Sequence, residues 1–315
     1  MLEAGGGRRL RASLCLGLVG LLGLHAARAA EAGPDVQADV TVVAEGAGFR
    51  VLSELDGALD LPVLDWLAIA DAAFSSRIAA EAEAEGAVRE VVLAGLGFAP
   101  RATCPDRGGD EEADGHDYSA HVARGAAAFF ARSCGRIHVQ DPGAHFGAAE
   151  LRATLLHEAT HQLVAAEGYA RLTGPGAWLS EGLGVFAETL SDSGKNDLRR
   201  VRRLAEARML FYSGRLLPLA EFLALDARGL EGLGQATVEY PWRGRAHERH
   251  VALHHTQASS VMAWLQHDFP DDLSRLIRIG LVDGLPPERL EAELCRTRAE
   301  LQRAYTNYFH QLRGA

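Results

Sequence analysis

The sequence predicts an α+β fold, in which a small mixed sheet near the N-terminus is followed by a mainly helical part. Short runs rich in β-branched residues occur before residue 146, whereas apolar residues recur at helical spacing from residue 147 onward. Glycine and proline separate these segments in both halves. The 315 residues are 48% hydrophobic and 23% charged, which is enough apolar sequence for one large domain or two modest ones.

The first 29 residues have the features of a secretory signal peptide. Arginines come first, an apolar run of eleven residues follows at 14–24, and Ala27-Arg28-Ala29 offers a small-x-small cleavage site. The run is too short to span a bilayer comfortably, although an uncleaved N-terminal anchor is the alternative. We expect cleavage near Ala29 and a secreted or periplasmic protein, with no membrane span in the mature chain.

The chain is acidic, with a formal net charge of −10. Loss of the leader would remove four Arg and one Glu and make the mature chain more acidic still. Nucleic acids and anionic membrane surfaces require clustered Lys and Arg, so the charge argues against both as main partners. The sequence does not reveal the oligomeric state.

Three cysteines would remain after export to an oxidising compartment. Cys104 and Cys134 flank one segment and are favoured as a disulfide pair. Cys295 lies in a helical pattern, and we expect it to be a buried thiol.

Residues 30–146 are expected to form an N-terminal α/β part. Its predicted elements are, in chain order, two strands and a turn within 38–56, a helix over 61–85, a strand over 88–95, a loop over 99–117 and a strand over 136–141. The last of these strands directly precedes the next predicted helix, and we expect it to form the sheet edge beside that helix.

Residues 147–315 are expected to be mainly helical. We expect the two parts to share one cleft, and they could together form a single domain. The spacing predicts helices near 148–167, 178–192, 195–213, 250–267, 271–283 and 286–311. Residues 226–249 are rich in Gly and Arg and are expected to be a long connection, either a lid or a mobile segment.

The stretch LLHEATHQLV, residues 155–164, contains a His-Glu-x-x-His pattern. On an α-helix His157 and His161 lie on one face, one turn apart, so both imidazoles can bind a single cation. Glu158, beside the first of them, can face a metal-bound water. The pattern predicts a catalytic metal site, and the alternative is a helix whose histidines bind no metal.

A third ligand is expected from a second helix. Glu181 follows His161 by twenty residues, across the Gly-Pro-Gly turn 174–176. Two His and one Glu leave the fourth position of tetrahedral zinc open, which is the catalytic arrangement. Gly182 and Gly184 would keep the second helix slim enough to pack close to the first. The alternative is a solvent-facing Glu181.

HEATHQLV followed by AWLSEGLGVFAE resembles the gluzincin branch of zinc metallopeptidases, and within it a secreted bacterial group of Peptidase-MA-like domains of unknown function. The shared pattern is an HEatHql helix, a WLsEGlAeyfE helix and a later Y-x-Q-s helix. The resemblance implies one Zn²⁺ bound by His157, His161 and Glu181, with Glu158 as general base. It also implies a zincin-like metallopeptidase fold, a mixed sheet over the HExxH helix followed by a helical subdomain.

The chain departs from this pattern where the family has a tyrosine. Within LHHTQASSVMAWL that position holds His254 or His255, and His255, two residues before Gln257, is favoured. A histidine can donate to an oxyanion as a tyrosine hydroxyl does, so His255 is the candidate catalytic donor. Tyr240 in the long connection is the other candidate, and loss of the role is the alternative.

Glu188 lies seven residues after Glu181, on the same face of the predicted helix. It can hold a ligand histidine through the second ring nitrogen. It can equally form a surface ion pair, and the sequence leaves both interpretations open.

These patterns predict a secreted zinc peptidase in which Glu158 assists the attack of a zinc-bound water on a peptide or protein substrate. Gluzincin aminopeptidases carry a GxMEN stretch, which is missing here, so endopeptidase activity is slightly favoured. The alternatives are a non-catalytic zinc-site binding or scaffold protein and a zinc hydrolase of a non-peptide bond such as a cell-wall amide.

Overall fold

The computed structural model describes residues 41–46, 48–53, 62–78, 89–94, 128–132, 135–140, 148–194, 202–242 and 245–312. All of them belong to one compact unit, Val40–Ala315. The predicted leader, the loop 99–117 and both cysteines of the predicted disulfide lie outside the described residues. Within the described ranges every helix is too short or too polar to cross a bilayer.

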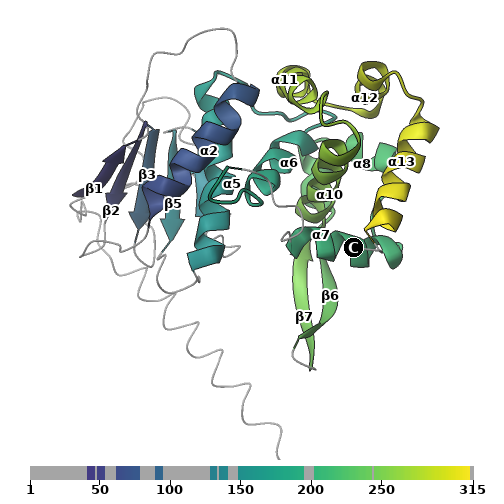
Figure 1. Ribbon diagram of the computed structural model, residues 1–315, viewed down its shortest axis with the longest axis horizontal. Helices are drawn as coiled ribbons and strands as arrows, with labels where there is room; N and C mark the ends of the chain where they lie inside the picture. The colour runs from purple at the N-terminus through teal and green to yellow at the C-terminus, as the bar shows by residue number, and fades with distance from the viewer. Residues whose placement is uncertain are drawn as a thin grey trace, which may run out of the picture. The chain divides into compact units, whose positions relative to one another are not determined.

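The first described elements form a five-stranded mixed sheet (Figure 1). Its strands in spatial order are β1 (Thr41–Gly46), β2 (Phe49–Ser53), β3 (Arg89–Ala94), β5 (Arg136–Gln140) and β4 (Ala128–Ala131). The pairs β1–β2 and β4–β5 are antiparallel, whereas β2–β3 and β3–β5 are parallel. The predicted α+β class is confirmed, as are the strands within 38–56, 88–95 and 136–141.

The edge of this sheet differs from the prediction. The sequence does not predict β4, because its four residues, Ala-Phe-Phe-Ala, are too few to show an alternating pattern. β4 pairs with β5 and covers its outer side, so β5 is an internal strand. The strand at the sheet edge beside the HExxH helix is therefore β4, and the assignment of 136–141 to that edge is wrong.

Two helices, α2 (Val63–Ile78) and α5 (Ala148–Ala166), pack against each other and against the sheet (Figure 1). Their apolar side chains recur at intervals of three and four residues and meet alternate residues of the strands. The buried side chains of this layer include Trp66, Leu67, Phe74, Val91, Leu93, Ile137, Val139, Leu151, Leu155 and Leu163. Because α5 carries the HEATH sequence, this core positions the candidate site.

The rest of the unit is mainly helical. Its helices are α6 (Trp178–Ala187), α7 (Arg202–Tyr212), α8 (Leu219–Leu223), α9 (Ala227–Gly232), α10 (Leu253–Asp268), α11 (Leu273–Asp283), α12 (Pro287–Leu294) and α13 (Arg298–Gln311). α6 packs between α5 and α10, and α10 also contacts α7 and α13. The sheet layer and the helical part thus share one continuous hydrophobic core.

The predicted connection 226–249 is instead structured. It contains α9 and most of an antiparallel hairpin, β6 (Gln235–Trp242) and β7 (Arg245–Ala252), which extends beyond the ends of α7 and α10 (Figure 1). Ala236 and Val238 alternate with polar residues and bury their side chains. This short alternation is obscured in the sequence by the surrounding Gly and Arg residues.

The predicted helix 286–311 is two helices. The C-cap of α12 is Cys295, whose backbone is left-handed with a φ of 50°. The N-cap of α13 is Thr297. Thr297 and Glu300 form a reciprocal capping box, which is a helix start signal that interrupts the apolar periodicity. Cys295 is exposed, so the prediction of a buried thiol is wrong.

The turn before α6 is packed against the loop between α11 and α12. Gly176 has a φ of +85°, and a Cβ there would lie 2.2 Å from the backbone nitrogen of Leu285. Trp178 Nε1 donates to the carbonyl oxygen of Leu285 at 3.0 Å and fixes the first residue of α6 to the same loop. This contact determines where α6 begins.

We therefore expect Gly176→Ala to lower the free energy of unfolding by at least about 2 kcal/mol, because it adds backbone strain and a clash with backbone atoms. Gly174→Ala is the matched control, since a Cβ there meets nothing within 4 Å. Urea unfolding of both variants checks this, and equal effects of the two substitutions would contradict it.

Candidate metal centre

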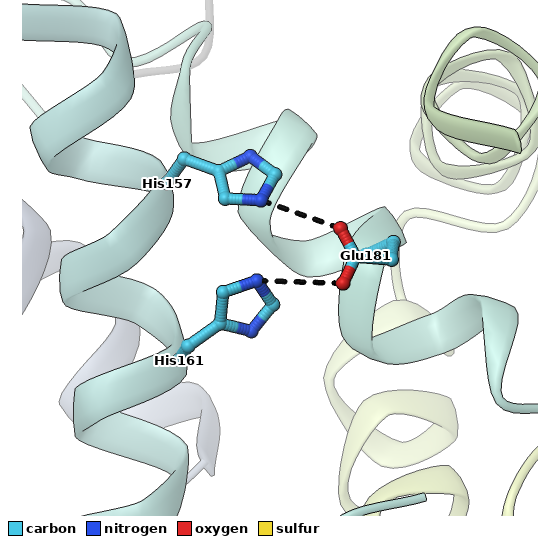
Figure 2. Close-up of side chains that lie close together, drawn as sticks. All are labelled: His157, His161 and Glu181. Atoms are coloured by element: carbon cyan, nitrogen blue, oxygen red, sulfur yellow. Dashed lines mark ion pairs between the residues drawn. The ribbon is translucent and has the colours of Figure 1, made fainter. Parts of the chain in front are cut away.

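α5 and α6 bring together the three residues expected to bind metal (Figure 2). His157 Nε2 lies 3.4 Å from Glu181 Oε2, and His161 Nε2 lies 3.7 Å from Glu181 Oε1. One ligand atom from each residue can be chosen so that all three lie within 4.8 Å of one another. The glutamate carboxylate thus faces both imidazoles, as the spacing in the sequence predicts.

These distances match the dimensions of a zinc site. Bonds of about 2.0–2.1 Å to tetrahedral zinc place neighbouring ligand atoms about 3.3 Å apart. The two observed separations, 3.4 and 3.7 Å, are near that value but reach different oxygens of Glu181, and one atom from each of the three residues lies within 4.8 Å of the others. Two imidazole nitrogens and one carboxylate oxygen are also a donor set that zinc accepts. The residues present therefore fit the ion.

The absence of a side chain at Gly184 allows α6 to approach α5 this closely. A Cβ on Gly184 would lie 2.7 Å from the His157 ring, closer than any side chain tolerates. A Cβ on Gly182 would instead lie 3.1 Å from both Met262 on α10 and the ring of Trp178. The two glycines thus serve opposite faces of α6, and Gly184 is the one that lets the helix reach the face of α5 that carries His157 and His161.

Buried hydrogen bonds fix α5 relative to the sheet. The Gln162 amide donates to the carbonyl oxygens of Glu90 on β3, at 3.0 Å, and of Gly135 before β5, at 2.7 Å. Both acceptors lie near the beginnings of neighbouring strands, so the two bonds tie α5 to one end of the sheet. Because Gln162 directly follows His161, these bonds also hold the second ligand in place.

Glu158 lies beneath the sheet edge. Its Oε2 accepts a hydrogen bond from the backbone N–H of Phe130 on β4, at 2.9 Å. Burial raises the pKa of Glu158 to about 7, although the positive charge of His157 and this hydrogen bond act in the opposite direction. A carboxyl group with such a pKa can accept and return a proton near neutral pH.

Glu188, at the C-cap of α6, contacts a ligand histidine. His157 Nδ1 lies 3.0 Å from Glu188 Oε1, and Arg203 on α7 binds the same carboxylate through two hydrogen bonds of 2.7 and 2.8 Å. Burial opposes ionisation, but Arg203 and His157 outweigh it and lower the pKa of Glu188 to about 2. Glu188 therefore contacts His157 and at the same time forms a largely buried ion pair with Arg203.

The two histidines differ in charge. Burial acts to lower the pKa of His157, but hydrogen bonds to Glu181 and Glu188 outweigh it and raise that pKa to about 10. Burial lowers the pKa of His161 to about 4, against the attraction of Glu181. His161 therefore offers a neutral imidazole, whereas a cation would displace the proton that His157 shares with Glu181.

His255 on α10 lies at this centre as well. Its Nε2 is 2.9 Å from Glu181 Oε2, and its ring centroid is 5.5 Å from that of His157. The Gln257 amide, which bonds both the N–H and the carbonyl of Leu217, fixes this turn of α10.

The two other candidates for the oxyanion donor are placed differently. The ring of His254 packs on His255 at 4.1 Å, and its Nδ1 is buried without a hydrogen-bond partner among the described residues. Tyr240 lies on β6 rather than in a loop, and its side chain is outside the described part of the structure.

Three contributors to the site are not identified from the sequence. Ser180 Oγ lies 3.4 Å from His161 Nδ1, and its place directly before Glu181 on an apolar helix is a signal that could have revealed it. Phe130 contributes only a backbone N–H, which no residue pattern reports. Arg203 is fifteen residues from its partner Glu188, and no helical spacing relates the two.

Comparison with known proteins adds one match. Residues 152–215 match the family model described as a protein of unknown function (DUF1570). That segment contains both histidines, Glu158, Glu181, Glu188 and Arg203, but neither β4 nor His255. No curated protein and no solved structure matches the chain.

The contact between α6 and the His157 ring leads to a test. We expect Gly184→Ala to weaken Zn²⁺ binding by at least about tenfold, because the added methyl group displaces a ligand. Gly182→Ala adds the same methyl group toward Met262 and the Trp178 ring, away from His157, and should leave Zn²⁺ affinity within a few-fold. Chelator competition measures both affinities, and equal affinities would contradict the expectation.

Proposed function

We propose that the protein is an exported zinc-dependent peptidase of the gluzincin type with a zincin-like fold. The observation that carries the proposal is the convergence of His157, His161 and Glu181, from two helices, beside the partly buried Glu158. A mixed sheet over α5 and the helical part that follows are the arrangement such a fold would have. The proposed substrate is a peptide or protein, with internal cleavage favoured.

His157, His161 and Glu181 would hold the ion, and each side chain would supply one ligand atom. When bound, Zn²⁺ would supply Lewis-acid chemistry, lowering the pKa of water and polarising a carbonyl. Three protein ligands leave a position for water or substrate, whereas purely structural zinc sites are closed by four. The presence of Glu158 is unexplained by a structural site and favours catalysis.

Glu158 would act as the general base and then as the acid. The Phe130 N–H holds its carboxylate in one orientation, from which it could take a proton from water and pass it to a leaving amine. A single residue, Glu158, would therefore carry out both proton transfers.

His255 would donate a hydrogen bond to the oxyanion. Its Nε2 lies 2.9 Å from Glu181 Oε2, close enough to the three candidate ligands to support this role. An imidazole N–H in a partly buried site can stabilise developing negative charge. This role separates His255 from the three metal ligands.

We expect Glu158→Gln to retain Zn²⁺ and to lower peptide hydrolysis by at least about 10²-fold, because the amide cannot accept the proton. Glu150→Gln, in the first turn of the same helix, is the control and should keep wild-type activity. Mass spectrometry of a mixed peptide library, with zinc content determined in parallel, measures both.

Cleavage by Glu158→Gln at the wild-type rate would overturn the mechanism. Bound zinc with no cleavage by the wild-type protein would favour a binding protein or a hydrolase of a non-peptide bond. Products trimmed only from free N-termini would replace the endopeptidase assignment with an exopeptidase one.

His255→Ala should lower kcat by about 10²–10³-fold, with zinc content unchanged, because an oxyanion donor acts mainly in the transition state. His254→Ala, one residue away, should cause a smaller loss. Steady-state kinetics of the two variants tests the choice between them. A larger loss in His254→Ala would reverse the assignment.

A further inference from the structure

Arg203 forms a connection from α7 to the metal centre that the proposed function does not use. Its Nε donates to Glu188 Oε2 at 2.7 Å, and its Nη2 donates to Glu188 Oε1 at 2.8 Å. Glu188 Oε1 also lies 3.0 Å from His157 Nδ1. The side chains of Glu188 and Arg203 are only 15% and 25% exposed, so water screens this chain of contacts poorly.

The chain of contacts fixes the tautomer of a ligand. A carboxylate can only accept, so His157 must carry a proton on Nδ1 and donate it to Glu188. Loss of the second ring proton to a cation would then leave the free lone pair on Nε2, the nitrogen that faces Glu181. The planar fork of Arg203 occupies both oxygens of Glu188 and prevents the carboxylate from rotating away from the imidazole.

A second carboxylate, on α7, acts electrostatically on Arg203. Glu206, one turn further along that helix, is 1% exposed and lies 3.6 Å from Arg249 of the β6–β7 hairpin. The attraction of Glu188 and Glu206 outweighs burial and raises the pKa of Arg203. The carboxylates of Glu188 and Glu206 thus face the guanidinium groups of Arg203 and Arg249 between α6, α7 and β7.

We propose that Arg203 is a positioning residue of the metal centre, which holds Glu188 against His157 and thereby sets the affinity for Zn²⁺. This inference rests on the proposed zinc site, but not on the reaction it catalyses. Residues that orient ligand histidines through a carboxylate typically change metal affinity by about 10–100-fold when they are replaced.

The competing interpretation is that Arg203 and Glu188 form an ion pair that only stabilises the fold. A structural ion pair would change the free energy of unfolding, but it would leave the metal affinity of the folded protein unchanged. Zn²⁺ affinity from chelator competition and the visible absorption of the Co²⁺-substituted protein therefore distinguish the two. Both are read without any peptide substrate.

We expect Arg203→Gln to weaken Zn²⁺ binding by about 10–100-fold and to alter the Co²⁺ spectrum. Arg203→Lys, which keeps the charge but loses the fork, should lie between this variant and the wild type. Arg208→Gln is the matched control, because Arg208 lies on the same helix and donates to the carbonyl oxygen of Leu312 instead. Its affinity should equal that of the wild type.

A double substitution decides whether Arg203 acts through Glu188. In the Glu188→Gln background the further change Arg203→Gln should weaken Zn²⁺ binding less than twofold, because the residue it positions is already altered. The double variant leaves no unpaired buried charge, so it remains informative where Arg203→Gln alone fails to fold.

Each outcome has a separate meaning. Folded Arg203→Gln with wild-type affinity and spectrum overturns the inference and leaves the proposed function intact. Full additivity in the double variant also overturns it. A wild-type protein that binds no Zn²⁺ overturns both the inference and the proposed function.

Discussion

The close approach of α6 to α5 is the constraint on which the rest of the site depends. Gly184 lies directly against the His157 ring, and any larger residue would separate the two helices. Because the helices meet there, Glu181, almost one turn earlier on α6, reaches both imidazoles, and Glu188, one turn later, reaches the far side of one of them. The contact between Gly184 and His157 therefore brings the three candidate ligands together with Glu188, which contacts one of them.

The surrounding elements restrict this arrangement from three directions. Gln162 ties α5 to the sheet, the Phe130 N–H ties Glu158 to the sheet edge, and Arg203 ties Glu188 to α7. Each bond satisfies a buried polar group that would otherwise destabilise the fold. The same bonds limit the rotation of the side chains that face the centre, so stability and preorganisation have a common origin here.

The predictable features are those set by local periodicity. Helical geometry alone places His157 and His161 on one face, and the Gly-Pro-Gly turn with the family resemblance indicates Glu181. The paired β1 and β2 and the helical character after residue 147 follow from the apolar spacing. The edge strand β4, the β6–β7 hairpin and the contact of Arg203 with Glu188 depend on tertiary packing, which single-sequence patterns do not report. Cys295 is misassigned because a capping box splits an apparently continuous helix.

X-ray absorption spectroscopy at the zinc edge of the purified protein tests the central claim most directly. The account predicts one zinc per chain, with two imidazole nitrogens and carboxylate or water oxygens at about 2.0–2.2 Å. In His157→Ala or Glu181→Ala the number of imidazole or oxygen ligands should change accordingly. A sulfur ligand, or an unchanged spectrum in both variants, would show that the metal lies elsewhere and would contradict the account.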